Sequence, residues 1–140
     1  MAKEIVLHTN KVYIGDPCYV IKGPDYDRLC DTGDGTIVPG VGICYSTGCG
    51  DCELEDNDGN LFNFDSGQIA IVDASHCDLS VKKDASFFER LFVDSLLTIE
   101  VPSGSAKVTM DKDSDGDIWM TVIDESNGDM LFHSYLHTSD

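Results

Sequence analysis

The chain has 140 residues and carries 26 acidic against 9 basic side chains, a formal charge of -17. Such a surface repels nucleic acid and anionic membranes and attracts basic proteins and divalent cations, which excludes direct binding to DNA, RNA or membrane. The apolar fraction of 41% is too high for a disordered acidic tail, and the length fits a single domain over residues 1–140.

The N-terminus does not resemble a targeting segment. Met1–Ile5 lacks the apolar stretch of a signal peptide, and no apolar run approaches the ~18 residues of a membrane span. The sequence therefore predicts a cytoplasmic protein. In that compartment its six cysteines are expected to be reduced thiols.

The first half of the chain predicts short strands separated by turns. Val6–Val20 reads as extended structure with an interruption near Gly15, and Pro24 suits the first turn of a short helix. The glycine-rich stretch Thr32–Gly42 predicts a loop. The remaining elements are expected to be a strand, a hairpin and a strand, at Ile43–Thr47, Glu53–Phe64 and Gln68–Asp73.

The second half predicts one amphipathic helix and then a run of strands. The helix covers about residues 85–97: Ser86 and Glu89 have capping-box spacing, and an apolar stripe follows. Period-two patterning then predicts a C-terminal β-meander of four strands, at Thr98–Val101, Ala106–Met110, Ile118–Ile123 and Met130–Leu136. The fold class is therefore α+β, mainly antiparallel β-sheet.

A short internal echo relates two segments 57 residues apart. In each, a tight turn is followed by an apolar strand that ends in an aspartate, Asp16 in the first and Asp73 in the second. These aspartates could simply close turns next to buried strands. Alternatively, they could form a pair of carboxylates at one end of a sheet, able to do acid–base work or hold a metal.

The same segments carry a resemblance. Ile14–Val20 contains G-D-P-C-Y, a Gly-Asp pair follows at Gly50–Asp51, and Phe64–Val72 contains the turn Asp65-Ser66-Gly67 before an apolar strand. These features resemble a family of small uncharacterised phage and bacterial proteins with G-D-P-C-Y and V-D-S-G signatures. The resemblance implies a β-rich domain and a phage origin, with no known activity.

Two patterns could hold metal ions. Cys49 and Cys52 form one C-x-x-C knuckle, to which Cys44 and His76–Cys77 could add zinc ligands, but a second knuckle is missing and inert thiols are the alternative. Asp111, Asp113, Asp115 and Asp117 match the alternating oxygen ligands of a calcium loop. The twelfth position of that loop is Val122 rather than Glu, so an acidic hairpin turn is the alternative.

The sequence contains no decisive catalytic signature. The leading hypothesis is a non-enzymatic acidic binding protein without a cofactor, which docks on a basic protein. Its concrete form is a phage-type inhibitor that imitates the phosphate array of nucleic acid in the host cytoplasm and blocks a host protein. The expected contact face combines two acidic segments: Asp51, Glu53, Glu55, Asp56 and Asp58, with Asp111, Asp113, Asp115 and Asp117.

Two other readings stay open. One is a virion or structural accessory protein, in which the edge of the meander pairs with neighbouring chains. The other is a protein that binds a small ligand or calcium.

Overall fold

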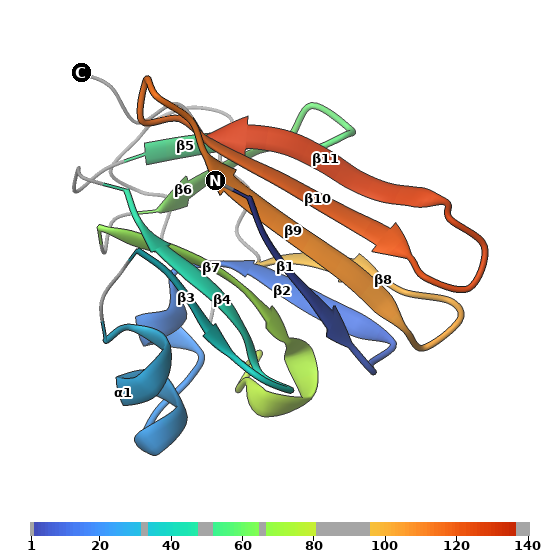
Figure 1. Ribbon diagram of the computed structural model, residues 1–140, viewed down its shortest axis with the longest axis horizontal. Helices are drawn as coiled ribbons and strands as arrows, with labels where there is room; N and C mark the ends of the chain where they lie inside the picture. The colour runs from blue at the N-terminus through green and yellow to red at the C-terminus, as the bar shows by residue number, and fades with distance from the viewer. Residues whose placement is uncertain (1, 32–33, 48–51, 65–66, 81–95, 137–140) are drawn as a thin grey trace.

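The computed structural model of the chain describes residues 2–31, 34–47, 52–64, 67–80 and 96–136, with the backbone alone at 34, 52 and 63. Within these residues strands dominate, helical turns are few and short, and every strand pairing is antiparallel. The strands form two larger sheets and a separate hairpin (Figure 1).

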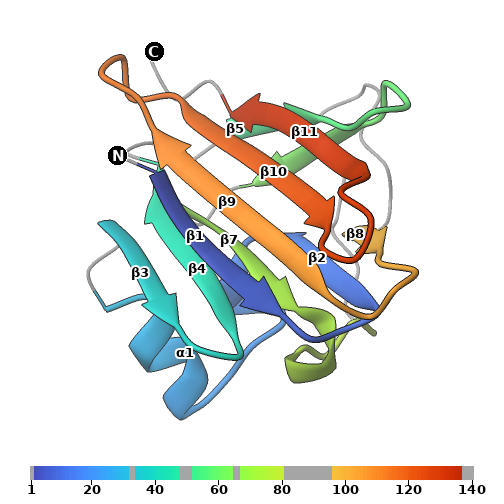
Figure 2. The ribbon, with the colours of Figure 1, turned by 45° about the vertical axis from the view of Figure 1, so that its right-hand side comes forward.

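One sheet has four strands and joins the N-terminus of the chain to its C-terminal part. Across the sheet its strands are β1 (Ala2–Leu7), β9 (Ala106–Lys112), β10 (Ile118–Asp124) and β11 (Met130–Leu136). The hairpin of β5 (Cys52–Glu55) and β6 (Leu61–Phe64) lies beyond β11, and β5 contacts that strand (Figure 2).

The other sheet has five strands. Across it they are β3 (Asp34–Val38), β4 (Gly42–Ser46), β7 (Gln68–Asp73), β2 (Lys11–Gly15) and β8 (Leu97–Glu100). The helix α1 (Pro24–Leu29) and the 3-10 turns η1 (Pro17–Tyr19) and η2 (Ala74–His76) lie outside this sheet. Among the described residues, no helix has the length and apolar character needed to cross a membrane.

Burial shows which sheet has a free face. Side chains of β2, β4 and β7 are buried almost without interruption, because one core lies between the two sheets and a second lies beneath α1. Side chains of β9 and β10 alternate between buried and accessible. This alternation is typical of an antiparallel sheet that is covered on one side only, so the four-stranded sheet presents its outer face to solvent.

The structure corrects the predicted meander. β9, β10 and β11 follow one another as neighbouring strands, but β8 pairs with β2 in the five-stranded sheet, and β1 takes the place beside β9. A period-two pattern shows that a segment is a strand but does not identify its partner, because pairing across the chain depends on tertiary packing.

The predicted loop over Thr32–Gly42 is also wrong in part. β3 occupies Asp34–Val38 and pairs with β4, and the register shifts between Asp34 and Thr36. Gly35, at a φ of 78°, supplies the backbone geometry of this irregularity. Glycine content suggested a loop, whereas the β-branched run Thr36–Val38 forms the strand.

The predicted helix of residues 85–97 lies almost wholly outside the described residues. Its last predicted residue, Leu97, is the first residue of β8. By contrast, the predicted short helix at Pro24, the strands at Ile43–Thr47 and Gln68–Asp73, and the hairpin at Glu53–Phe64 are confirmed.

Candidate functional site

The outer face of the four-stranded sheet carries an exposed aromatic cluster on β10 and β11. Ile118, Met120 and Val122 of β10 point into the core, so alternation turns Trp119 and Thr121 outward. On β11, Tyr135 lies opposite Trp119 and His133 lies opposite Thr121. Residues paired directly across two strands share one face, which brings these side chains together.

The three rings of this cluster are stacked. The ring centroids of Trp119 and Tyr135 lie 4.7 Å apart with an interplanar angle of 23°, and those of Trp119 and His133 lie 5.9 Å apart at 28°. Trp119 is 39% and Tyr135 46% exposed, so much of their ring surface remains accessible. Trp119, His133 and Tyr135 are called the aromatic platform below.

Polar groups hold the platform in position. The indole Nε1 of Trp119 donates to Oδ2 of Asp113 at 2.9 Å, and Oγ1 of Thr121 is hydrogen-bonded to Nδ1 of His133 at 3.0 Å. The Trp119 hydrogen bond, followed by backbone N–H groups of the turn, holds the pKa of Asp113 below its usual range against the opposing effect of burial. These hydrogen bonds orient Trp119 and His133 before any partner arrives.

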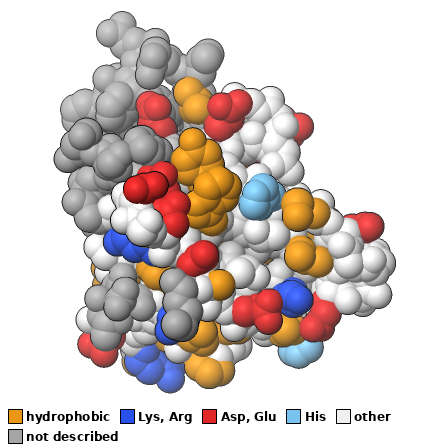
Figure 3. Space-filling model, turned by 45° about the horizontal axis from the view of Figure 1, so that its top comes forward, with side chains coloured by type: hydrophobic (Ala, Val, Ile, Leu, Met, Phe, Trp, Pro, Cys, Tyr) orange, Lys and Arg blue, Asp and Glu red, His pale blue; other side chains and the backbone are white. Residues whose placement is uncertain are grey.

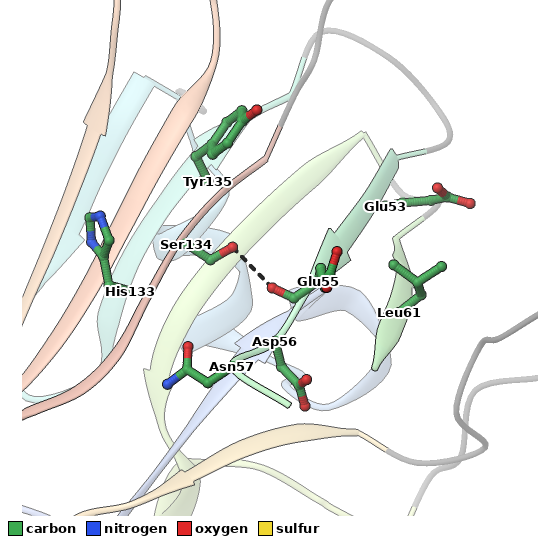
Figure 4. Close-up of a pocket in the computed structure, with 8 residues that line it drawn as sticks. All are labelled: Glu53, Glu55, Asp56, Asn57, Leu61, His133, Ser134 and Tyr135. Carbon is green, nitrogen blue, oxygen red and sulfur yellow. Dashed lines mark hydrogen bonds between the residues drawn. The ribbon is translucent and has the colours of Figure 1, made fainter. Parts of the chain in front are cut away.

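An acidic groove runs beside the platform, between β11 and the β5–β6 hairpin (Figure 4). Its volume is about 510 Å³. Two hydrogen bonds tie its walls together: Ser134 Oγ donates to the carbonyl of Glu55 at 3.0 Å, and Asn57 Nδ2 donates to the carbonyl of Leu131 at 3.3 Å. The groove is lined by Glu53, Glu55, Asp56, Asn57, Leu61, His133, Ser134 and Tyr135.

The structure brings several of the predicted acidic residues to this site. Glu53, Glu55 and Asp56 line the groove, and Asp113 binds the platform directly. Asp111 lies opposite Trp119 across β9 and β10, hence on the same face. In the space-filling view of Figure 3, hydrophobic side chains adjoin a histidine and acidic side chains lie on several sides of them.

The two predicted acidic segments do not form one uninterrupted row. The turn that begins at Asp56 is hydrogen-bonded to β11 at Leu131, near one end of that strand. The turn that begins at Asp113 leads into Ile118, which pairs with Leu136 at the other end of β11. These two positions on β11 are five residue steps apart, about 17 Å along the strand. Asp58, Asp115 and Asp117 lie on the two turns, and Asp51 lies outside the described residues.

Asp56 and Asp113 begin two turns of the same construction. Oδ1 of Asp56 accepts from the N–H groups of Asp58 and Asn60, and Oδ1 of Asp113 accepts from those of Asp115 and Asp117. In each turn a glycine with a positive φ, 87° in Gly59 and 89° in Gly116, completes a three-residue hairpin loop.

The segment predicted as a calcium loop forms a hairpin turn between β9 and β10. The carboxylate of Asp113 is directed at backbone N–H groups and the Trp119 indole. Over the described part of the chain, no three His, Cys, Asp or Glu side chains gather in a way that could hold a metal ion.

The structure separates the two aspartates of the internal echo. β2 and β7 are antiparallel, and Ile14 lies directly opposite Ile71, its own counterpart in the echo. A local two-fold axis therefore passes between these isoleucines and places Asp16 and Asp73 at opposite ends of the pair, about 13 Å apart along the strands. The expectation of two carboxylates at one end of a sheet is wrong.

Both aspartates instead lead into 3-10 turns. Their backbones are nearly identical, with φ and ψ of -69° and 117° at Asp16 and -63° and 119° at Asp73. Asp73 accepts from the N–H of Ser75 at 2.9 Å, and both residues are buried. Of the adjoining Asp-Ser-Gly turn, Asp65 and Ser66 lie outside the described residues, while Gly67 accepts from the N–H of Thr47.

The structure tests only part of the predicted zinc ligands. Cys49 lies outside the described residues, and of Cys52 only the backbone is described. Cys44 is buried in the core beneath α1, and Cys77 packs against that core. Burial, and then the nearby Asp73, raise the pKa of Cys77 to about 12, so this thiol is protonated at neutral pH.

Sequence reasoning missed the aromatic platform. Trp119 stands between the buried residues Ile118 and Met120, and period-two alternation already places it on the solvent side. Its stacking on Tyr135 depends on the register of β10 and β11, which the sequence does not state.

Comparisons with protein-family models, curated proteins and solved structures found no match to this chain.

Proposed function

We propose that this chain is a non-enzymatic binding protein that docks a basic protein on the aromatic platform and the acidic groove. The observation that carries the proposal is the exposed, hydrogen-bonded Trp119 and its stacked neighbours beside the carboxylates of Glu53 and Glu55. Tryptophan and tyrosine are enriched at the few interface positions that supply most binding energy. Rings already held in place lose little conformational entropy on binding.

The charge of the whole molecule supports a basic partner. A net charge of -17 attracts cationic proteins over a distance and speeds their encounter, and nearby carboxylates then favour cationic side chains over neutral ones. Exposed π faces add cation–π attraction for the same side chains. The aromatic rings and the carboxylates of this site therefore both favour a partner with exposed lysine or arginine side chains.

A narrower form of the proposal is a phage-type inhibitor that imitates the charge of nucleic acid and blocks a basic host protein. The supporting feature is the set of carboxylates on two sides of the platform, with Glu53, Glu55 and Asp56 along the groove and Asp111 and Asp113 beside Trp119. Such an inhibitor would compete with DNA for its target. Competition that persists after loss of the platform and groove residues would contradict this form.

Fluorescence titration tests the general proposal, because Trp119 is the single tryptophan of the chain and lies at the site. A short peptide rich in lysine and arginine should change the emission of Trp119 at low salt. Binding should weaken strongly between about 50 mM and 0.5 M salt as the charges are screened. A neutral peptide of the same length should leave the emission unchanged.

Matched variants locate the binding. Glu53→Gln/Glu55→Gln should weaken binding about tenfold, since two carboxylates of the groove are lost. Asp27→Asn/Glu100→Gln removes the same charge from exposed positions on α1 and β8, away from the outer face of the four-stranded sheet, and should change binding little. Equal effects of the two double variants, measured by calorimetry, would contradict a localised site.

A further inference from the structure

The geometry points to an extended, arginine-bearing segment of a protein partner as the occupant of this site. This inference rests on the proposed function and deepens it. It distinguishes arginine from lysine and specifies how the arginines are spaced.

The aromatic platform favours arginine because its rings are planar and the stack keeps accessible ring surface. The guanidinium group is planar, weakly hydrated and able to stack on an aromatic ring, whereas the lysine ammonium is a compact and strongly hydrated point charge. Trp119 and Tyr135 lie within 23° of parallel and keep large exposed fractions. The hydrogen bond from Trp119 to Asp113 orients the stack, and its most exposed ring, Tyr135, which also lines the groove, is the surface on which a guanidinium would stack.

The groove supplies carboxylates next to the platform, because Glu53 and Glu55 line it together with Tyr135 and His133. Glu53 and Glu55 are two residues apart on β5, so both are exposed on one side of that strand, with the buried Leu54 on the other. A guanidinium can bind a carboxylate through two parallel N–H bonds, which lysine cannot do. Leu61 in the groove and the ring of Tyr135 offer apolar surface to the methylene stem of an arginine.

The spacing of the carboxylates favours an extended partner. Glu53 and Glu55 are about 7 Å apart along the strand. Alternate side chains of an extended peptide are separated by the same distance, so arginines at positions i and i+2 can face the two carboxylates together. A helical segment would instead bring i and i+3 or i+4 to one face.

Three peptides of equal length and charge test the inference. One carries two arginines at i and i+2, the second carries lysines at those positions, and the third carries arginines at i and i+3, with serine elsewhere. Isothermal titration at low salt should show the first peptide binding about tenfold more tightly than the second. It should also bind more tightly than the third.

A variant of the aromatic platform tests whether its rings cause the preference for arginine over lysine. Trp119→Leu removes an exposed ring from the outer face and leaves the core residues Ile118 and Met120 in place. It should reduce the affinity for the arginine peptide to that for the lysine peptide and leave lysine binding nearly unchanged. Circular dichroism and thermal melting establish that the variant is folded.

The outcomes separate the two proposals. Equal affinity for arginine and lysine peptides would overturn this inference and leave the basic-partner proposal standing. Equal affinity for the two arginine spacings would overturn the extended geometry. If none of the three peptides binds at low salt, the proposed function itself fails.

Discussion

Aspartate side chains in this protein repeatedly bind the backbone N–H two residues ahead. Among the residues that the structure describes, Oδ1 makes this bond from Asp56, Asp73, Asp78, Asp113 and Asp124. Each carboxylate replaces a backbone partner at the beginning of a turn, which is a common use of aspartate. Part of the acidity is therefore structural, and the charge total overstates the acidic surface that is available to a partner.

Asp124 allows a test of this structural role. It is 1% exposed and accepts N–H groups from Ser126 at 3.0 Å and Ser103 at 3.2 Å, so it joins two turns. Hydrogen bonds from the side chain and backbone of Ser103, and then from Ser126, hold the pKa of Asp124 below its usual range. A lowered pKa means that the folded state favours the charged form.

The substitution Asp124→Asn should therefore lower the free energy of unfolding at pH 7. The stabilisation by Asp124 is present above about pH 4, the ordinary aspartate value, and is lost as the pH falls through the lowered folded-state pKa. Urea unfolding of the variant and the wild type should converge in acid. Asp129→Asn, an exposed position in the same turn, is the control; an equal loss of stability there would contradict the role of Asp124.

At Gly15 an added side chain would meet both backbone strain and close neighbouring atoms. The φ of Gly15 is +153°, and a Cβ atom there would lie 2.5 Å from the Tyr13 hydroxyl oxygen and 2.9 Å from Phe64. Gly15→Ala should cost about 2–4 kcal/mol of unfolding free energy, from backbone strain and overpacking together. Gly40→Ala, with φ +78° and no atom within 4 Å of the added Cβ, should cost about 1 kcal/mol. Denaturant unfolding that ranks these variants equally would contradict the steric argument.

At the scale of elements, the turn of Asp113 links the fold to the site. The same carboxylate closes the β9–β10 hairpin and holds the indole of Trp119. Asp113→Ala should shift the fluorescence of Trp119 and weaken binding of a basic peptide, while the sheet remains folded because its core residues are unchanged. Asp115→Ala, at the exposed tip of the same turn, should change neither the fluorescence of Trp119 nor the binding of the peptide. An unchanged emission in Asp113→Ala would contradict the role of Asp113 in positioning Trp119.

Local patterns predicted several elements correctly, and tertiary pairing explains the errors. The hairpin at Glu53–Phe64 was predictable because its turn residues and its strands are adjacent in sequence. The pairing of β1 with β9 and of β8 with β2 joins distant segments, and no local pattern contains it. The strand β3 was missed because its glycine, Gly35, serves an irregular strand pairing rather than a loop.

The candidate site was predictable only in part, because it too depends on contacts between segments that are distant in sequence. Acidic residues of the groove such as Glu53 and Glu55 were identified from charge alone. The aromatic platform requires the register that places Tyr135 opposite Trp119, and the groove requires β5 to lie beside β11. Both are products of the assembled fold.

At the scale of the whole molecule, the two sheets differ in role. The central strands β2, β4 and β7 of the five-stranded sheet are buried on both faces, between the main core and the core beneath α1, and Asp16 and Asp73 are buried where η1 and η2 begin. The four-stranded sheet is buried on one face and displays the aromatic platform on the other. The proposed binding function therefore belongs to the half of the fold that has a free surface.

Amide chemical-shift mapping tests this central claim most directly. Isotope-labelled protein is titrated with the peptide that carries arginines at i and i+2, at low salt. We expect the largest shifts at residues 52–57, 118–122 and 132–136 and at the indole N–H of Trp119, with small shifts at α1 and β3. Shifts spread evenly over all acidic turns, or concentrated near Asp25 and Asp27 of α1, would contradict it.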